Sequence, residues 1–375
     1  MTRALLIVLD GVGAGAAPDA ARYGDEGSDT IGHVLRETGV ALPTLAQLGL
    51  HRLLGLPDAP APRAMHGRMR ERSAGKDSTT GHWEIAGIEL AEPFAVFDRF
   101  PDALVRTIEA ETGVTFLGNF AASGTAIVEE LGPEHLATGR PILYTSADSV
   151  LQIAAHESVI PVPRLYAICE IARRHADAHR IGRVIARPFT GPPGAFERTQ
   201  RHDFSMAPPA SVLDAIAGTG LPVITIGKVA DLFAGQGVTR SCPTSGNAEG
   251  MHRTAELWAA TEQGLVFTNL VDFDTVFGHR RDIAGFAAAL AAFDTWLGGF
   301  LPQIAPEDLL IVTADHGCDP THAGTDHTRE EVPLLVVHRG RADPIGTREG
   351  FFDVAATLAE HFGIRPWPIG LSILR

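Results

Sequence analysis

The stretch LLIVTADHG (309–317) decides the fold, because it is an apolar run of strand length that ends in an acidic residue and a histidine. Two other stretches have the same form: ALLIVLD (4–10) ends at Asp10, and LVFTNLVDFD (265–274) ends at Asp274. Continuous apolar runs of this length are typical of strands that are buried on both faces. They predict an α/β protein with a ligand site at the carboxyl edge of its sheet.

Helical patterns alternate with these strands. Amphipathic helices are predicted over 281–301 and 351–363, and a further helix over 208–220 leads into the strand-like LPVITIGK (221–228). PLLVVH (333–338) adds another strand. This alternation predicts a parallel or mostly parallel sheet that is covered by helices on both faces.

The sequence pattern of residues 96–207 differs from that of the rest of the chain. This region has strand and helix patterns of its own, and its edges are marked by AEPFAVFDRFP (91–101) and SMAPPA (205–210). We therefore expect an inserted domain over 96–207, with residues 1–95 and 208–375 together forming a discontinuous core domain.

Composition narrows the class of protein. The 375 residues carry a formal net charge of −14, which argues against a general nucleic-acid role. Three widely spaced cysteines imply no disulfide framework. The apolar run Ala4–Leu9 is too short for a signal peptide or a membrane span, so we expect a cytoplasmic protein that binds neither nucleic acid nor membrane.

Acidic and histidine residues gather at the predicted strand ends and in the loops that follow. They comprise Asp10, Asp274, His279, Asp315, His316 and His327. Taken singly, each aspartate has the ordinary alternative of a helix cap or a turn. Taken together, three carboxylates at one sheet edge would repel one another unless cations were present. Two divalent ions with about three protein ligands each satisfy the pattern, and mixed Asp/His ligation suits Mn²⁺ or Zn²⁺ better than Ca²⁺.

Longer motifs carry a resemblance to a known family. They are GKDSTTGHWEIAG (75–87), YTSADSVLQIAAHE (144–157), GRVIARPF (182–189), VDFDTVFGHRRD (271–282) and TADHGCDPTHAGTDHTREEVPLL (313–335). These stretches closely resemble the phosphopentomutase family of alkaline-phosphatase-like metalloenzymes, and the similarity runs almost from end to end. The resemblance implies an alkaline-phosphatase-like core with a mostly parallel sheet and an inserted α+β cap domain. It also implies two Mn²⁺ ions, a phosphorylated enzyme that is primed by a sugar bisphosphate, and interconversion of ribose or deoxyribose 1-phosphate with the 5-phosphate.

The resemblance also assigns residues to the reacting centre. One metal ion would be held by Asp274, His279 and His327, and the other by Asp10, Asp315 and His316. The nucleophile would be Ser78, where the family usually has Thr, and Thr79 is its main competitor. Lys76, two residues earlier, is expected to favour the phosphorylated serine.

The substrate contacts are likewise implied by the resemblance. Arg187, Arg201 and Lys228 would bind the distal phosphate of the pentose, and Asp148 would accept hydrogen bonds from its hydroxyls. Lys76 and Lys228 are the only lysines among 31 basic residues, which draws attention to both positions.

Two other classes of function stay open. A phosphoglycerate mutase or a phosphohydrolase shares the superfamily, and an inactive metal-binding scaffold would keep the ligands without the chemistry. The sequence leaves open the choice of pentose, the native metal, the roles of Cys318 and His322, and the oligomeric state, for which a monomer is expected.

Overall fold

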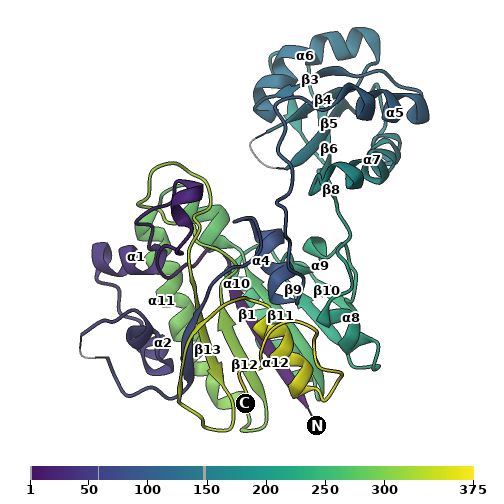
Figure 1. Cartoon of the computed structure of the whole chain (residues 1–375). Coiled ribbons are helices and arrows are strands. Elements are labelled where there is room, and N and C mark those ends of the chain that lie inside the picture. The colour runs from purple at the N-terminus through teal and green to yellow at the C-terminus, as the bar shows by residue number, and fades with distance from the viewer. Residues whose placement is uncertain (1, 58, 147–148) are drawn as a thin grey trace. The chain divides into compact units, whose positions relative to one another are not determined.

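The computed structural model describes residues 2–57, 59–146 and 149–375. The chain divides into two compact units (Figure 1). The core unit comprises Met1–Glu92 and Pro208–Arg375, and the inserted unit comprises Pro93–Ala207. The core unit therefore joins two distant parts of the sequence, whereas the inserted unit is one continuous segment.

One sheet runs through the core unit. Its strands follow the order β10 (Arg240–Cys242), β9 (Val223–Ile226), β11 (Gly264–Leu270), β1 (Arg3–Leu9), β12 (Leu309–Thr313), β13 (Val332–Val337), β2 (Met65–Met69) and β14 (Pro344–Arg348). Strands β10 to β12 are mutually parallel, and β13 runs antiparallel to both β12 and β2. The strands β1, β11 and β12 are buried along their length, as parallel strands covered on both faces must be.

Helices cover both faces of this sheet (Figure 1). One layer contains α1 (Thr30–Thr38), α2 (Pro43–Leu48), α3 (Leu50–Leu53), α10 (Asn247–Ala260) and α11 (Ile283–Phe300). The other contains α4 (Ser78–Ile85), α8 (Val212–Ala217), α9 (Val229–Leu232) and α12 (Asp353–His361). Short helical turns are η1 (Ala20–Tyr23), η3 (Phe273–Gly278) and η4 (Leu301–Gln303).

Helix α11 is long and apolar enough, with the residues that follow it to Gln303, to cross a membrane by length and composition alone. In the structure it buries Phe286, Leu290, Phe293 and Leu297 and packs against α1, α2 and α10. Its apolar face is therefore used inside the core unit.

The inserted unit is a second α/β layer structure. Its sheet follows the order β3 (Leu117–Ala121), β4 (Ile142–Thr145), β5 (Val150–His156), β6 (Arg183–Thr190) and β7 (Glu197–Arg198), and β8 (His202–Ser205) also pairs with β6. Parallel and antiparallel pairs alternate from β3 to β7. Helices α5 (Asp102–Thr112) and α7 (Val162–Ala176), with η2 (Asp177–His179), pack on one face, and α6 (Gly124–Thr138) packs on the other.

The α/β class and the strand–helix alternation predicted from the sequence are confirmed. One boundary is wrong: the strand predicted over 265–274 ends at Leu270, and Asp274 lies in the π-helical turn η3. The strand stops because Asp272 exchanges two hydrogen bonds with Asn247, at 2.7 and 2.9 Å. Single π-helical turns of this kind often occur at functional sites.

Candidate active site

Three buried carboxylates meet at the carboxyl edge of the core sheet. Asp10 follows β1, Asp315 lies two residues past β12, and Asp274 lies in η3 after β11. Because these strands are parallel neighbours, their ends deliver the three side chains to one place. At most 3% of any of the three residues is exposed.

The first set of candidate ligands is Asp10, Asp315 and His316. The Nε2 atom of His316 lies 3.3 Å from Oδ1 of Asp10 and 3.4 Å from Oδ2 of Asp315. One donor atom from each residue therefore falls within 4.8 Å of the other two, which is the spacing of ligands around one ion.

The second set is Asp274, His279 and His327. The Nε2 atoms of both histidines lie 3.3 Å from Oδ1 of Asp274. The His327 ring also lies 4.1 Å from the ring of His316, measured between centroids, so the two sets adjoin. The structure thus brings together all six residues predicted as metal ligands.

The donor set fits divalent cations. Three atoms of these residues are buried and make no hydrogen bond within the described chain: Oδ1 of Asp274, Oδ2 of Asp315 and Nε2 of His327. A buried charged or polar atom without a partner is strongly unfavourable. Nitrogen and oxygen donors that converge in this way are ligands of Mn²⁺, Zn²⁺ and related ions.

The electrostatics of the edge agree with this fit. Burial lowers the pKa of His316, but Asp315, Asp10 and Asp274 outweigh burial and raise the pKa to about 10. Burial also raises the pKa of Asp274, but His327 and His279 outweigh it and hold the pKa well below its ordinary value. The edge therefore favours positive charge.

Ser78 is the first residue of α4, and its hydroxyl lies among these groups. The Oγ atom is 3.1 Å from Nε2 of His316 and 3.4 Å from Oδ1 of Asp10. Asp77 caps the helix by accepting from the backbone N–H groups of Thr79 and Thr80. The Thr80 hydroxyl is committed to Asp77 as well, at 2.6 Å.

A close backbone approach fixes α4 in this place. A Cβ atom on Gly81 would come within 2.1 Å of the carbonyl oxygen of Asp315. Only glycine fits there, and it lets the helix that carries Ser78 rest directly on the loop that carries Asp315.

The two lysines have different surroundings. Nζ of Lys228 donates to Ser78 Oγ at 2.8 Å and lies 2.5 Å from Oδ2 of Asp10. Burial lowers its pKa, but Asp10 and two further carboxylates outweigh burial and raise it. Lys76, which was expected to act on the phosphorylated serine, instead pairs with Asp25 at 3.0 Å and Asp326 at 3.4 Å. Lys228 is therefore the cation at the Ser78 hydroxyl.

Two residues at the site were not singled out from the sequence. Nδ2 of Asn269 donates to Oδ2 of Asp10 at 3.0 Å. Nδ1 of His82 lies 3.0 Å from Oδ2 of Asp315. Asn269 is an amide residue inside the mostly apolar run of β11, and that irregularity is the signal from which it could have been found.

Arg329 was also missed, although it organises the segment before Ser78. Its side chain is only 2% exposed. The guanidinium donates to three backbone carbonyls and pairs with two carboxylates, namely Glu71 O, Ser73 O, Gly75 O, Glu71 Oε2 and Asp19 Oδ2. Because Arg329 follows His327 by two residues, it ties the loop that carries this candidate ligand to the segment that leads into α4.

Cys318 and His322 lie in the same loop but differ in burial. Cys318 is buried, and its Sγ lies 4.0 Å from Nδ1 of His279. Potential ligand atoms of Cys318, Asp274 and His279 lie within 4.8 Å of one another. His322 is partly exposed, and its Nε2 lies 3.3 Å from the carbonyl of Gly24.

Of the predicted substrate residues of the inserted unit, Arg187 lies on β6 and Arg201 directly precedes β8. Nε of Arg187 donates to Oε1 of Gln152 at 3.1 Å, and Arg201 makes two hydrogen bonds of 2.5 Å to Asp203. Asp148, predicted to contact the pentose hydroxyls, lies outside the described residues.

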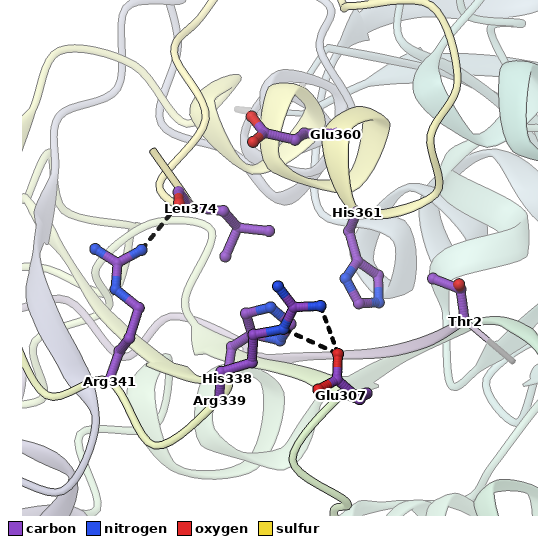
Figure 2. A pocket seen from close by; sticks show the side chains of 8 residues that line it. All are labelled: Thr2, Glu307, His338, Arg339, Arg341, Glu360, His361 and Leu374. Carbon is purple, nitrogen blue, oxygen red and sulfur yellow. Dashed lines mark hydrogen bonds and ion pairs between the residues drawn. The ribbon is translucent and has the colours of Figure 1, made fainter.

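A cavity of about 450 Å³ lies at the opposite edge of the core sheet, where β1 and β12 begin (Figure 2). It is lined by Thr2, Glu307, His338, Arg339, Arg341, Glu360, His361 and Leu374. Arg339 pairs there with Glu307 at 2.9 Å, and Arg341 reaches the carbonyl of Leu374 at 2.9 Å. Of the described residues that line it, none is a predicted site residue, so the candidate chemistry belongs to the other edge.

A mostly parallel three-layer core with a buried Asp/His centre at its carboxyl edge defines a metalloenzyme. The profile of the metalloenzyme superfamily matches residues 2–366, and the chain belongs to that superfamily. Among solved structures, the core fold is shared with the phosphoglycerate mutase of Leishmania mexicana, at a TM-score of 0.51 and 14% identity over 99% of this chain and 97% of that one. The alkaline-phosphatase-like fold class implied by the sequence is confirmed.

The particular family follows from closer relatives. The phosphopentomutase of Syntrophotalea carbinolica is 53% identical over 96% of this chain and 95% of its own. The phosphopentomutase of Caldanaerobacter subterraneus subsp. tengcongensis is 52% identical over 100% of this chain and 98% of its own. The chain belongs to the phosphopentomutase family and is an enzyme.

Proposed function

We propose that this enzyme interconverts ribose 1-phosphate, or 2-deoxyribose 1-phosphate, with the corresponding 5-phosphate through a phosphoserine at Ser78. The observation that carries the proposal is the position of the Ser78 hydroxyl, within 3.4 Å of Asp10, His316 and Lys228. A hydroxyl held between candidate metal ligands and an ammonium is equipped to exchange a phosphoryl group.

Two divalent ions are part of this proposal, and we expect Mn²⁺. Asp10, Asp315 and His316 would hold one ion, and a second set, Asp274, His279 and His327, would hold the other. When bound, such ions supply positive charge to the transferring phosphoryl group and to the oxygens that it joins and leaves.

The first transfer begins with phosphorylated Ser78. The bond between phosphorus and Oγ breaks as a hydroxyl oxygen of the pentose phosphate bonds to phosphorus. The proton of that hydroxyl passes to the departing Oγ, so the products are a pentose 1,5-bisphosphate and the free Ser78 hydroxyl. Negative charge develops on Ser78 Oγ as it leaves. The Lys228 ammonium, 2.8 Å away, stabilises that charge.

The second transfer reverses the first at the other phosphate. The bisphosphate turns, Ser78 Oγ bonds to the second phosphorus, and the sugar oxygen that leaves takes up a proton. The phosphoserine is restored, and the phosphate has changed position. A sugar bisphosphate would prime an unphosphorylated enzyme by the same step.

We assign the inserted unit to substrate binding and to the exclusion of water, because water would convert the mutase into a phosphatase. Arg187 and Arg201 would bind the distal phosphate, and Asp148 the pentose hydroxyls. Lys228, first expected at the distal phosphate, is assigned to Ser78 because of its contact there.

The proposal includes a cellular setting. The substrate is a small pentose phosphate of nucleoside metabolism, and we propose a cytoplasmic monomer without nucleic-acid or membrane partners. The net charge of −14 supports the first exclusion.

Mass spectrometry tests the mechanism directly. Wild-type protein treated with a sugar bisphosphate is expected to carry one phosphate on Ser78, and Ser78→Ala is expected to carry none. Phosphate on Thr79 would move the nucleophile. In a coupled assay, ribose 5-phosphate is expected to form from ribose 1-phosphate without stoichiometric release of inorganic phosphate; rapid release would favour a phosphohydrolase.

A further inference from the structure

Cys318 lies in the loop after β12 and has no part in the proposed mechanism. Its backbone N–H donates to the Thr30 hydroxyl at 3.1 Å, which fixes the place of this residue in the loop. The side chain is buried, and its thiol donates a hydrogen bond to the carboxylate of Asp274. The thiol therefore lies at the candidate metal site and not at the surface of the loop.

Two glycines leave room for this side chain. A Cβ atom on Gly278, in the π-helical turn η3, would overlap Sγ of Cys318. A Cβ atom on Gly11, directly after Asp10, would lie 2.9 Å from Cβ of Cys318. A larger residue at either position would displace the thiol, so the backbone on both sides leaves a place for the sulfur beside the candidate ligands.

The sulfur belongs to a close group of possible ligand atoms. One donor atom each from Cys318, Asp274 and His279 falls within 4.8 Å of the other two. Nδ1 of His279 donates to the carbonyl oxygen of Thr325 at 2.6 Å, and Nε2 of the same ring faces Asp274. A backbone carbonyl that holds one ring nitrogen in this way orients the other nitrogen toward a metal ion.

The Asp274 carboxylate points to an ion independently of the cysteine. Its Oδ1 atom is buried and makes no hydrogen bond of standard geometry with any described residue. Nε2 of His279 and Nε2 of His327 nevertheless both lie 3.3 Å from it. Oxygen and nitrogen donors that converge on one point are typical of the ligands of a divalent cation, and the thiol lies beside them.

We propose that Cys318 is a fourth donor to the ion held by Asp274, His279 and His327, and that its sulfur gives this site a preference for a thiophilic divalent metal such as Zn²⁺ or Co²⁺. The thiol proton passes to solvent as the bond between sulfur and metal forms. Thiolate selects zinc and related ions, whereas Mn²⁺ prefers carboxylate and water. The assignment rests on the proposed function in one respect, namely that the other three residues hold an ion.

Absorption spectroscopy with Co²⁺ tests for the sulfur ligand directly. Full-length protein is freed of metal by a chelator and titrated with Co²⁺, because a bond between thiolate and Co²⁺ gives a charge-transfer band in the near ultraviolet. We expect this band in the wild type and its loss in Cys318→Ser. The matched control is Cys242→Ser, a partly exposed cysteine of β10, which should keep the band. A wild type that binds Co²⁺ without the band, or a Cys318→Ser protein that retains it, would overturn the proposal.

Calorimetric titration of the same metal-free proteins measures selectivity. Cys318→Ser is expected to raise the Kd for Zn²⁺ about tenfold or more, and the Kd for Mn²⁺ by less than about threefold. The set formed by Asp10, Asp315 and His316 contains no sulfur, so binding there is the internal reference. An equal rise for both metals would assign the cysteine to the shape of the site and overturn its role as a ligand.

X-ray absorption of the zinc-loaded wild type needs no variant, so it decides the matter even if Cys318→Ser does not fold. Sulfur is expected among the atoms bound to zinc. A zinc environment of nitrogen and oxygen alone would overturn the proposal.

The two proposals fail in different ways. A wild type with mutase activity whose bound Co²⁺ shows no sulfur band would refute the role of Cys318 alone. A wild type that shows the band but has no mutase activity would refute the proposed function and keep the sulfur ligand.

Discussion

The edge of the core sheet and the α6 side of the inserted unit gather charges of opposite sign. At the core edge, Asp10, Asp274 and Asp315 are buried close together, and their negative charges favour cations. In the inserted unit, Arg187, Arg198 and Arg201 surround the buried hydroxyl of Tyr144, and their positive charges favour an anion. The first arrangement suits chemistry on a phosphoryl group, and the second suits recognition of one. Variants of the core edge should therefore lower kcat and metal content, whereas variants of the inserted unit should raise KM.

The largest effect is expected from His327→Gln. Loss of this ligand should reduce bound metal from two ions to about one per chain and lower kcat on the order of 10³-fold, since it removes charge stabilisation from the transition state. Elemental analysis and steady-state kinetics measure both. His322→Gln, a partly exposed histidine in the same loop, is the control and should keep both near wild type. Equal losses in the two variants would remove His327 from the ligand set.

A second prediction concerns the pH dependence of stability, which should reflect the buried carboxyl of Glu330 near the core edge. Burial raises the pKa of the Glu330 carboxyl to about 7. Hydrogen bonds from Thr328 and Thr30 oppose this rise, and the negative charge of Asp319 adds to it. The Cys318 thiol is a further neighbour of Glu330. A raised folded-state pKa means that its contribution to stability is present below pH about 4.5 and is lost as pH rises through about 7.

Glu330→Gln should remove this loss, because glutamine does not ionise. The free energy of unfolding of the variant, measured relative to that of the wild type, should therefore rise by about 3 kcal/mol between pH 5 and pH 8. Urea unfolding at several pH values measures the difference. Glu349→Gln, an exposed carboxylate with 67% side-chain exposure, is the control. Parallel pH profiles for Glu330→Gln and wild type would show that Glu330 stays ionised throughout this range.

Lys228→Met should lower kcat about 10²-fold with little change in KM, because the ammonium acts on the charge that develops at Ser78 Oγ. Single-turnover measurement of phosphoryl transfer from phosphorylated enzyme follows that step. Lys76→Met is the matched control, since Lys76 pairs with Asp25 and Asp326. A larger loss of transfer rate in Lys76→Met than in Lys228→Met would restore the role first expected for Lys76.

The smallest effect is expected from the inserted unit. Arg187→Gln should raise KM for the pentose phosphate about tenfold and leave metal content unchanged, since it removes a charged hydrogen bond to the distal phosphate. Arg174→Gln, an exposed arginine paired with Glu111, is the control. A fall in kcat with loss of metal would contradict the division of roles between the two units.

The clustering of the candidate ligands at the core edge was predictable, because several of them follow an apolar run in the sequence. Asp10 and Asp315 follow apolar strands, and parallel pairing brings such ends together. The end of β11 was not predictable in this way, because it depends on Asn247, which is distant in sequence from Asp272. The partners of Lys76 and Lys228 were equally hidden, since sequence spacing does not tell which ammonium reaches Ser78.

The residues of the inserted unit depend on strand register, which the sequence does not reveal. Tyr144, Gln152 and Arg187 lie on three different strands, and the pairings of β4 with β5 and of β5 with β6 place them on one face. Arg329 was missed for a related reason: three of its acceptors are backbone carbonyls, which a sequence does not reveal, and its two carboxylate partners, Glu71 and Asp19, are distant in sequence.

The order of strands in the core sheet has a consequence for synthesis. β1 is made first, yet its two neighbours are β11 and β12, so it has no partner until most of the chain has left the ribosome. The inserted unit, in contrast, is one continuous segment and has all of its own strands early. We expect the inserted unit to fold while the nascent core is still incomplete, and Asp10 to meet His316 only after β12 has been synthesised.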